Sequence, residues 1–596
     1  MSTDETPSSE LGRSHDSVTA FGRSVGTRTL AAVVAVTLVA LSLRLFALGT
    51  RVFHWDEARV GYWILRYAEN GIWEYHASIH GPFLYHVNKY LFQLFGASDF
   101  LARLPVAIVS GLLPLTAWLF RERLDRAEML TVGLFFALNP LLLYYSRFMR
   151  NDVLLAAFMV YALAFYVRLF DTHKPRYLYA GTLMLALAFT TKENVLVYVV
   201  TWLGAAVLLL EHRLLLVGGE DDRVALLRKW GSDLWHARRW WLHLALGLAF
   251  FFAVVIFFYA PRARGVPGPG LWKAFTNPGM FPAVVEEATV GSWEKFASKW
   301  GEGNQNSFLG TFKALWKPTQ QGALPLLVLA LVGFFVDRYD GPRPRDLVAF
   351  TFYWGFVSLV GYPVIVENPF PWEPIHAVVP LVIPAGVGLA VFVRWAAQAI
   401  GDSDGVSATL ATLLVLLVVG QMAATAVTTS FVHPQDEYLD DGQTDVNTLV
   451  QYGQPADGIR PTLELVGEVA RQNDGTDVLY YGSDFYVADE SDNDRWAAGG
   501  GWYNRLPIPW YTEHADAVVE SAADPSQLSG DVPPVVIARA SDSHVLDRRL
   551  SNYRAYEHEL TIHGSRTVFY VHEDALPSDA PPATDGGGGD SNDESS

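Results

Sequence analysis

The sequence predicts a polytopic α-helical membrane protein of about eleven transmembrane helices, followed by a C-terminal exterior α/β domain. The chain has 596 residues, 51% of them hydrophobic and 13% aromatic, and long apolar blocks alternate with short charged connectors. A helix needs about 20 mostly apolar residues to cross a bilayer, and about eleven of these blocks approach that length. After the last block the sequence turns polar and acidic, which indicates a separate soluble domain.

The predicted transmembrane domain extends from residue 29 to residue 431. Its spans are expected near 29–48, 104–120, 128–146, 152–170, 177–191, 194–210, 241–259, 323–336, 347–366, 374–395 and 407–431. Because no small-residue cleavage pattern follows the first span, we expect a retained helix and not a signal peptide. The polar residues 1–28 are expected to form a disordered cytoplasmic tail.

The basic connectors predict the orientation of the chain. Lys and Arg gather in four of them, 121–127, 171–176, 213–239 and 337–346. Cytoplasmic loops carry an excess of these residues, so we expect a multi-pass protein of the cell membrane with a cytoplasmic N-terminus. The loops 49–103 and 261–322 and the C-terminal domain then lie outside the cell.

The exterior domain is predicted to cover residues 432–572. Three short runs rich in β-branched and aromatic residues, at 477–482, 533–540 and 566–572, predict strands, and residues 461–472 show a helical pattern. Alternation of strands and helices indicates a small α/β layer. The low-complexity end, 573–596, is expected to be disordered.

Charge and cysteine content exclude several classes of function. From Phe431 onward the chain has 31 acidic and 9 basic residues, all of the latter Arg, so this part carries −22 against −18 for the whole chain. No basic groove for nucleic acid is present. The absence of cysteine excludes disulfides, a thiol nucleophile and thiolate metal sites. An acidic, lysine-free exterior suits concentrated salt, so we expect a haloarchaeal source.

The loop after the first span is the first candidate site. It reads HWDEAR and places Asp56 and Glu57 within about ten residues of the predicted membrane boundary. Two carboxylates there are positioned to act on a molecule that lies in the membrane. Helical patterns at 58–70 and 85–95 predict amphipathic helices in the interface. The structural alternative is a loop that only caps the helix bundle.

Two more turns on the same side carry charges. YYSRFMRND supplies Arg147, Arg150 and Asp152, and TTKEN supplies Lys192 and Glu193. Cations are disfavoured in short exterior turns, so their presence indicates a function. Contacts with lipid headgroups or local salt bridges are the structural alternative.

These motifs, in this order, resemble the GT-C superfamily of membrane glycosyltransferases. The DE pair after the first span, the turn ending in HGP, and the segments LFGASDFLARLP, YSRFMRND and ALAFTTKEN look like the protein O-mannosyltransferase and lipid A aminoarabinose transferase group. With WEPIHAVVPLVIP and the acidic domain, the whole chain is most similar to a haloarchaeal family named for association with flippase activity in protein N-glycosylation. The resemblance covers about residues 29 to 400. The chain lacks the second proline that the broader family has after HGP.

The resemblance implies an inverting transferase that moves a sugar from a polyprenyl (dolichyl) phosphate to a glycan or protein acceptor on the outer face. The acceptor must lose a proton, which a carboxylate can take, and we expect Asp56 in that role. The leaving phosphate needs cations, and the candidates are Arg147, Arg150 and Lys192, with Arg103 as a weaker one.

Other residues are expected to support this chemistry. Glu57 would orient the acceptor or, with His80 and Asp152, hold a divalent ion such as Mg, Mn or Zn. A hydrogen-bonded structural histidine is the alternative for His80. Near the bilayer, Glu367, Glu373 and His376 are expected in a wall of the lipid or acceptor cavity. The loop 261–322 is either a mobile lid or an ordered cap.

Two other classes of function compete with a transferase. One is a flippase, or a flippase-associated protein, that moves the lipid-linked sugar without transfer chemistry. Another is an enzymatically silent receptor whose exterior domain binds glycans. A transporter places ionisable residues near mid-span, whereas here they lie mostly at helix ends. This placement favours the enzyme.

Overall fold

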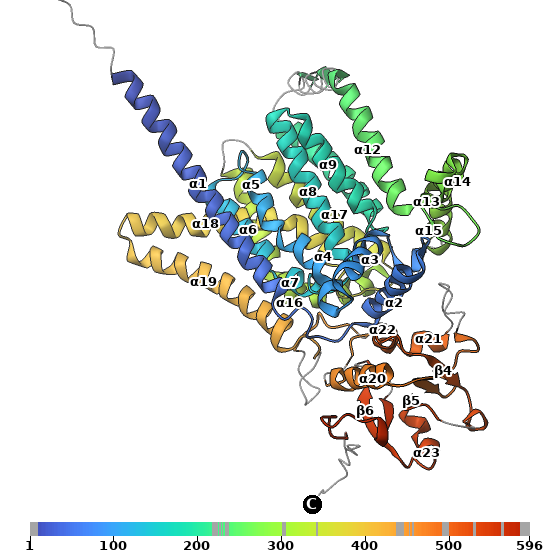
Figure 1. The fold of residues 1–596 in the computed structure, drawn as a ribbon. Helices are drawn as coiled ribbons and strands as arrows, with labels where there is room; N and C mark the ends of the chain where they lie inside the picture. Colours follow the sequence, from blue (N-terminus) through green and yellow to red (C-terminus); the bar gives the residue numbers. More distant parts are fainter. Residues whose placement is uncertain are drawn as a thin grey trace, which may run out of the picture.

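The computed structural model shows a bundle of long helices joined to a smaller sheet-containing domain (Figure 1). It describes residues 10–216, 224–225, 228, 231–232, 238–300, 306–340, 344–366, 368–436, 446–451, 453–455, 458–490, 500–528, 532–561 and 566–583. Within these residues, nine helical segments are long and apolar enough to cross a membrane. The chain is therefore a polytopic membrane protein, as its sequence predicts.

The helices of the nine long segments correspond to nine of the eleven predicted spans. They are α1 (Glu10–Leu45), α4 (Asp99–Gly111) with α5 (Thr116–Leu119), α8 (Asn151–Thr172), α10 (Val195–Leu216), α12 (Trp241–Tyr259), α16 (Phe308–Tyr339), α17 (Asp346–Ile365), α18 (Ile375–Gly401) and α19 (Gly405–Val427). Helix α1 begins at Glu10, inside the segment that we expected to be a disordered tail.

The two remaining predicted spans form shorter helices. The span expected at 128–146 is divided into α6 (Arg126–Leu138) and α7 (Pro140–Tyr145), and the span at 177–191 is α9 (Pro175–Phe189). The helix is divided at Pro140, because proline has no backbone N–H with which to continue a helix. Asn139 instead caps α7, because its Oδ1 accepts from the backbone N–H of Leu142 at 3.1 Å.

Helix α18 lies at the centre of the bundle and is mostly buried against α16, α17 and α6. Small residues allow this close packing. A Cβ added at Gly333 of α16 would lie 1.9 Å from the carbonyl oxygen of Pro384, and one at Gly388 of α18 would lie 2.1 Å from that of Leu329. Glycine is therefore required at both positions, as is common where membrane helices touch.

Both loops on the side of the C-terminal domain are ordered in their described parts. The first contains α2 (Trp55–Asn70) and α3 (Phe83–Phe95), which confirm the two predicted amphipathic helices. Strand β1 (Ile72–Trp73) pairs antiparallel with β2 (Arg262–Ala263) and so joins this loop to the second. The second loop continues with three short helices, α13 (Leu271–Thr276), α14 (Phe281–Glu286) and α15 (Ser292–Trp300), which flank the bundle in Figure 1.

The C-terminal domain is built on a five-stranded sheet in the order β4-β3-β5-β7-β6. Strand β3 (Val478–Tyr481) runs parallel to β4 (Val519–Ala522) and β5 (Val535–Arg539), while β7 (Arg566–His572) is antiparallel to β5 and β6 (Tyr553–Glu559). The predicted strands β3, β5 and β7 and helix α20 (Arg460–Gln472) are confirmed. The two edge strands were missed because their sequences, VESA and YRAYEHE, are polar and only partly buried.

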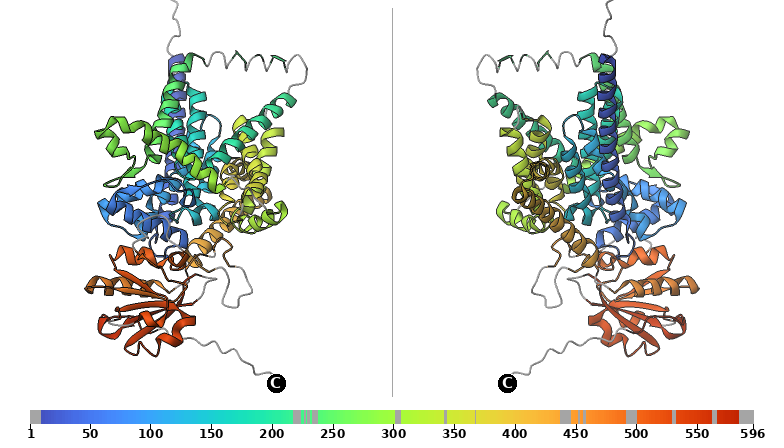
Figure 2. Two further views of the ribbon diagram at one scale, coloured as in Figure 1. Left: turned by 90° about the vertical axis from the view of Figure 1, so that its right-hand side faces the viewer. Right: turned by 90° about the vertical axis from the view of Figure 1, so that its left-hand side faces the viewer.

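A buried carboxylate attaches this domain to the bundle. Asp99, at the start of α4, accepts hydrogen bonds from Arg460 at 2.6 Å, Trp510 Nε1 at 2.9 Å and the Tyr511 hydroxyl at 3.0 Å. The latter two belong to α22 (Ile508–His514). In Figures 1 and 2 the amino-terminal end of α1 and the C-terminal domain lie at opposite ends of the bundle. The domain therefore sits at the end that also carries α2 and α3.

The charge of this domain predicts a salt-dependent stability. The residues from Phe431 onward carry −22, and such a density of like charges destabilises the compact state unless salt screens it. We expect the melting temperature of the purified chain in detergent to rise steadily between low and molar KCl. Circular dichroism across a salt titration measures it. A melting temperature that does not change with salt would contradict the halophilic interpretation.

Candidate functional site

The amino-terminal turn of α2 fixes the two acidic residues of HWDEAR. His54 caps the helix: its Nδ1 accepts from the backbone N–H of Asp56 at 3.1 Å, and the Glu57 carboxylate accepts from the backbone N–H of His54 at 3.0 Å. Burial lowers the pKa of His54 to about 3, so its ring is neutral and able to accept. Consecutive residues of a helix project about 100° apart. Asp56 and Glu57 therefore face different surroundings.

Asp56 lines a cavity of about 490 Å³. Its carboxylate is 25% exposed and pairs with two cations, Arg150 Nη1 at 2.6 Å and Arg59 Nη2 at 3.0 Å. Burial on its own raises the pKa of Asp56, but Arg150 and Arg59 outweigh it and hold that pKa well below its ordinary value. The structure thus presents an ionised carboxylate to the cavity, held by two arginines.

The HGP turn brings a second chain segment to this cavity. The backbone N–H of Gly81 donates to Thr191 O at 2.9 Å, and that of Phe83 donates to Thr190 O at 2.8 Å. A Cβ at Gly81 would lie 2.4 Å from Thr190 O, so only glycine allows the two turns to touch. Glycine in this motif therefore docks the first loop onto TTKEN.

This docking places His80 beside Glu193. His80 Nδ1 lies 3.0 Å from Glu193 Oε2, and the Tyr75 hydroxyl donates to Glu193 Oε1 at 2.6 Å. Both His80 and Glu193 line the cavity. Burial raises the pKa of Glu193, but the bonds from His80 and Tyr75 outweigh it and lower that pKa overall. Glu193 is therefore ionised and positions His80 at the cavity wall.

Two cations from different turns meet on the other side of Asp56. Lys192 Nζ lies 2.6 Å from Asp152 Oδ1 and 3.5 Å from Glu373 Oε1. Burial lowers the pKa of Lys192, but these two carboxylates outweigh it and raise that pKa. Arg150 lies 3.7 Å from Asp152 and is stacked on the ring of Trp372 at 3.7 Å. Arg150, Lys192 and Glu373 all line the cavity, whereas Asp152, which pairs with both cations, does not.

The predicted metal ligands do not gather as expected. Within the described residues, the set whose ligand atoms lie within 4.8 Å of one another is Asp152, Glu373 and His376, and it contains neither Glu57 nor His80. His376 is fully buried, its Nδ1 lies 2.8 Å from the Tyr198 hydroxyl and its Nε2 lies 3.4 Å from Asp152. A divalent ion would therefore have to share these carboxylates with Lys192.

Glu57 has an internal partner, which corrects its expected place beside Asp56. Its carboxylate is fully buried and forms a fork with Arg103, with Nε at 2.8 Å and Nη2 at 2.7 Å. The backbone N–H of Met149 adds a third bond at 2.6 Å. Arg103 also donates to the carbonyls of Leu48 and Arg51. Neither Glu57 nor Arg103 lines the cavity, so we assign this pair to the packing of the loop.

Arg147 also lies away from the cavity, although it is three residues from Arg150. Its guanidinium donates to four backbone carbonyls at the carboxyl end of α1, at 2.6 to 3.1 Å, from Leu43, Arg44, Phe46 and Ala47. This is the position where a helix end attracts a cation. Arg147 therefore caps α1 and is not available to a donor phosphate. The predicted wall residue Glu367 lies outside the described residues.

Several cavity residues escaped the sequence-based prediction. Arg59 follows Asp56 by three positions, a spacing that puts both on one face of a helix, and could have been found from that signal. Phe296 and Lys299 of α15 also line the cavity. Only the tertiary fold brings this part of the second loop to the cavity, where Phe296 and Lys299 form part of its lining.

The Glu57–Arg103 pair gives a prediction about stability. Glu57→Gln leaves the buried guanidinium of Arg103 without its countercharge, which should destabilise the fold by about 3–5 kcal/mol. Glu69→Gln on the same helix is the control, because that side chain is 71% exposed and should change little. Thermal unfolding in detergent measures both. A Glu57→Gln protein with wild-type stability and no transfer activity would instead make Glu57 catalytic.

Two protein families match parts of the chain. Residues 79–217 match the family described as dolichyl-phosphate-mannose-protein mannosyltransferase, and residues 459–573 match the Agl23 flippase-associated protein C-terminal domain. No curated protein matches the chain.

Two solved structures share the fold over almost the whole length. ArnT from Cupriavidus metallidurans in the apo state is 16% identical, with a TM-score of 0.54 over 91% of this chain and 98% of that one. The same protein bound to undecaprenyl phosphate is 16% identical, with a TM-score of 0.53 over 92% and 99%. The first family match includes His80, the Arg150 turn and Lys192. The chain therefore has the overall fold of ArnT, and within it residues 79–217 and 459–573 match these two families.

Proposed function

We propose that this protein transfers a sugar from a polyprenyl phosphate, such as dolichyl phosphate, to a glycan or protein acceptor on the outer face of the membrane, with inversion at the anomeric carbon. The observation that carries the proposal is the position of Asp56 in one cavity with Arg150 and Lys192. A proton acceptor and two cations side by side are what a displacement at a sugar phosphate requires. The C-terminal domain lies on the same side of the bundle and would then be extracellular.

The reaction divides its tasks among these residues. Asp56 takes the proton of the acceptor hydroxyl or amide while the acceptor atom bonds to the anomeric carbon. The bond from that carbon to the phosphate oxygen breaks, and polyprenyl phosphate leaves with an additional negative charge. Arg150 and Lys192 stabilise that charge, and the guanidinium of Arg150 can bind two phosphate oxygens at once. The acceptor and the donor phosphate thus contact different side chains.

Arg150 also couples donor binding to the base. In the structure its Nη1 bonds Asp56, and the resulting low pKa makes Asp56 a weak base. A donor phosphate in the cavity competes for the same guanidinium. When Arg150 turns to the phosphate, Asp56 loses its strongest partner and becomes more basic while Arg59 keeps it in place. Asp56 is then activated only when the donor is present.

The comparisons support a polyprenyl phosphate donor. One similar structure is of ArnT bound to undecaprenyl phosphate, and the family that matches residues 79–217 is named for a dolichyl-phosphate donor. The flippase-associated name belongs to the family that matches residues 459–573, which lie outside the cavity. Within the described part of the chain, the cavity charges lie at helix ends, as at the start of α8 and just before α18. This arrangement favours transfer over transport.

We further propose that Lys192 takes the place of a divalent ion. The formal charges in and beside the cavity balance without metal: four carboxylates, Asp56, Asp152, Glu193 and Glu373, face four cations, Arg59, Arg150, Lys192 and Lys299. Transfer should therefore continue unchanged in EDTA, as measured by sugar incorporation with the purified protein. Loss of activity in EDTA that Mn²⁺ or Zn²⁺ restores would show that Asp152, Glu373 and His376 hold an ion.

The proposal is tested in the cell by deleting the gene. We expect mass spectrometry of surface glycoproteins to show the loss of one sugar, and the corresponding polyprenyl phosphate sugar to accumulate. The accumulated lipid distinguishes a missing transfer step from a missing synthesis step. An unchanged glycan after deletion would contradict the proposal.

A further inference from the structure

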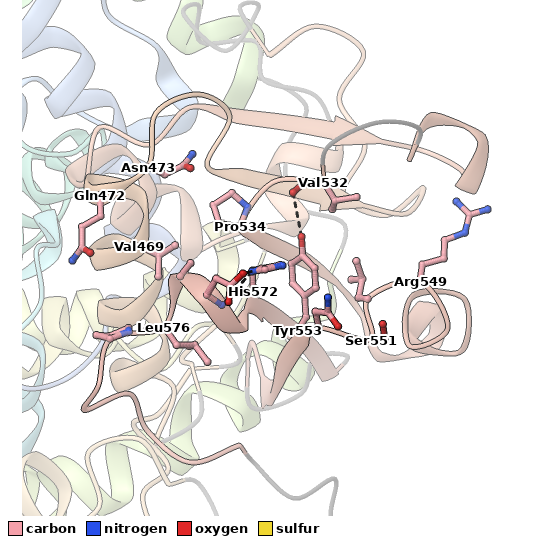
Figure 3. Close-up of a pocket in the computed structure, with 15 residues that line it drawn as sticks. Val469, Gln472, Asn473, Val532, Pro534, Arg549, Ser551, Tyr553, His572 and Leu576 are labelled. Atoms are coloured by element: carbon pink, nitrogen blue, oxygen red, sulfur yellow. Dashed lines mark hydrogen bonds and ion pairs between the residues drawn. The ribbon is translucent and has the colours of Figure 1, made fainter.

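A second cavity, of about 720 Å³, opens in the C-terminal domain. Figure 3 shows Tyr553 and His572 near its centre, Gln472 and Asn473 at one side and Arg549 at the other. Gln472 and Asn473 lie at the end of α20, Tyr553 begins β6 and His572 ends β7. Arg549 lies between α23 (Ser543–Leu546) and β6. Its volume is within the range of cavities that bind small molecules.

Two aromatic rings form a preformed wall of this cavity. The rings of Tyr553 and His572 are perpendicular, with centroids 4.9 Å apart. The Tyr553 hydroxyl donates to the carbonyls of Val532 at 3.1 Å and Pro533 at 3.0 Å, and His572 Nδ1 accepts from the backbone N–H of Asp574 at 3.2 Å. Both rings are thus held in place in the free protein.

Two neutral side chains that can form hydrogen bonds, those of Ser551 and Asn552, line the cavity together with these rings. Ser551 and Asn552 lie on the turn before β6, and their side chains are exposed and make no hydrogen bond within the residues that the structure describes. The turn itself is fixed, because the backbone N–H of Glu573 donates to Asn552 O at 2.9 Å. A hydroxyl and a primary amide can each donate and accept. They are therefore preplaced for a ligand that carries many hydroxyl groups.

The charge of the domain disfavours anionic ligands. The residues from Phe431 onward carry −22, which repels phosphates, nucleotides and acidic sugars. The cation at the cavity, Arg549, already donates to Pro525 O at 2.6 Å. Exposed polar groups make the cavity unsuitable for a lipid chain. We propose that it binds a neutral saccharide, with the apolar face of a sugar ring against Tyr553 and His572 and its hydroxyls on Ser551 and Asn552.

The position of the cavity indicates binding without chemistry. Helix α20 begins at Arg460, which bonds Asp99 of the bundle, and the cavity lies at its other end, 13 residues along. At 1.5 Å per residue this is a distance of roughly 18 Å from the bundle contact. A saccharide there cannot touch Asp56. The site is therefore independent of the proposed transfer and binds sugar whether or not the protein is a transferase.

Ligand-observed NMR with the full chain in detergent and molar KCl tests the proposal. The probes are two neutral trisaccharides, maltotriose and mannotriose, and the anionic trigalacturonate. Asn552→Trp fills the cavity, Ser551→Ala removes one hydroxyl, and Ser483→Ala alters an exposed serine of the same domain outside the cavity. Asp56→Asn reports on binding in the other cavity.

We expect saturation transfer to at least one neutral trisaccharide, a loss of about tenfold or more in affinity in Asn552→Trp, and a smaller loss in Ser551→Ala. Ser483→Ala and Asp56→Asn should bind like the wild type, and trigalacturonate should not bind. Should Asn552→Trp unfold, the result for Ser551→Ala decides. Equal binding in all variants, no binding of either neutral probe, or equal binding of trigalacturonate would overturn the proposal.

Discussion

Asp56→Asn should reduce sugar transfer by about a hundredfold or more. Asparagine keeps the size and polarity of the side chain but cannot accept the acceptor's proton, and general-base help contributes about 10²- to 10⁴-fold. The donor should still bind, because we propose that its phosphate contacts Arg150 and Lys192. Initial rates with a radiolabelled polyprenyl phosphate sugar, measured beside donor binding, separate the two effects.

A matched control keeps this result interpretable. Glu69→Gln removes a carboxylate from the same helix, but its side chain is 71% exposed and lies outside the cavity. It should transfer sugar at the wild-type rate. If Asp56→Asn is as active as Glu69→Gln, the carboxylate of Asp56 does not act as the base, and the flippase-associated alternative becomes the better account.

Arg150→Ala should reduce kcat/KM for the donor by at least about thirtyfold, because a charged hydrogen bond contributes about 2 kcal/mol. Arg150→Lys should recover only part of it, since lysine lacks the two-pronged geometry. Arg147→Ala is the comparison at the same turn. It should lower stability without a specific effect on donor affinity, because the guanidinium of Arg147 donates to carbonyls at and just after the end of α1 and lies over the ring of Phe431. Equal donor affinity in wild type and Arg150→Ala would contradict this assignment.

The same variant should change the pH dependence. In the wild type the pKa of Asp56 lies below its ordinary value, so the carboxylate stays ionised and gives no acid limb in kcat/KM above about pH 4. Removal of Arg150 leaves burial, which raises the pKa of Asp56, opposed mainly by Arg59. The acid limb should therefore move to higher pH in Arg150→Ala. An acid limb at the same pH in both proteins would show that Arg150 does not control the base.

The sequence predicts the elements of this site better than their contacts. The length of the apolar blocks and the charge of the loops between them were enough to predict the long helices. The helical spacing of apolar residues was enough to predict α2 and α3. The order of the motifs was enough to predict that Asp56, Arg150 and Lys192 lie in one site. Each of these signals is local, or depends only on which end of the bundle a turn occupies.

The sequence could not show which of two similar residues, close together in the chain, lines the cavity. Asp56 and Glu57 are adjacent and chemically alike, yet Arg103, 46 residues from Glu57, takes one of them into the interior. Arg147 and Arg150 share a turn, but one faces the end of α1 and the other faces the cavity. In each pair the role depends on a partner that is distant in the chain. Lys299 enters the site for the same reason, through the path of a long loop.

Reconstitution into liposomes tests the central claim most directly. The purified protein is supplied with a radiolabelled polyprenyl phosphate sugar and an acceptor glycopeptide, and both the labelled acceptor and the released polyprenyl phosphate are measured. We predict that the wild type forms the two products in equal amounts and that Asp56→Asn forms neither at more than about one-hundredth of that rate. Movement of intact lipid-linked sugar across the bilayer, without release of polyprenyl phosphate, would contradict the account.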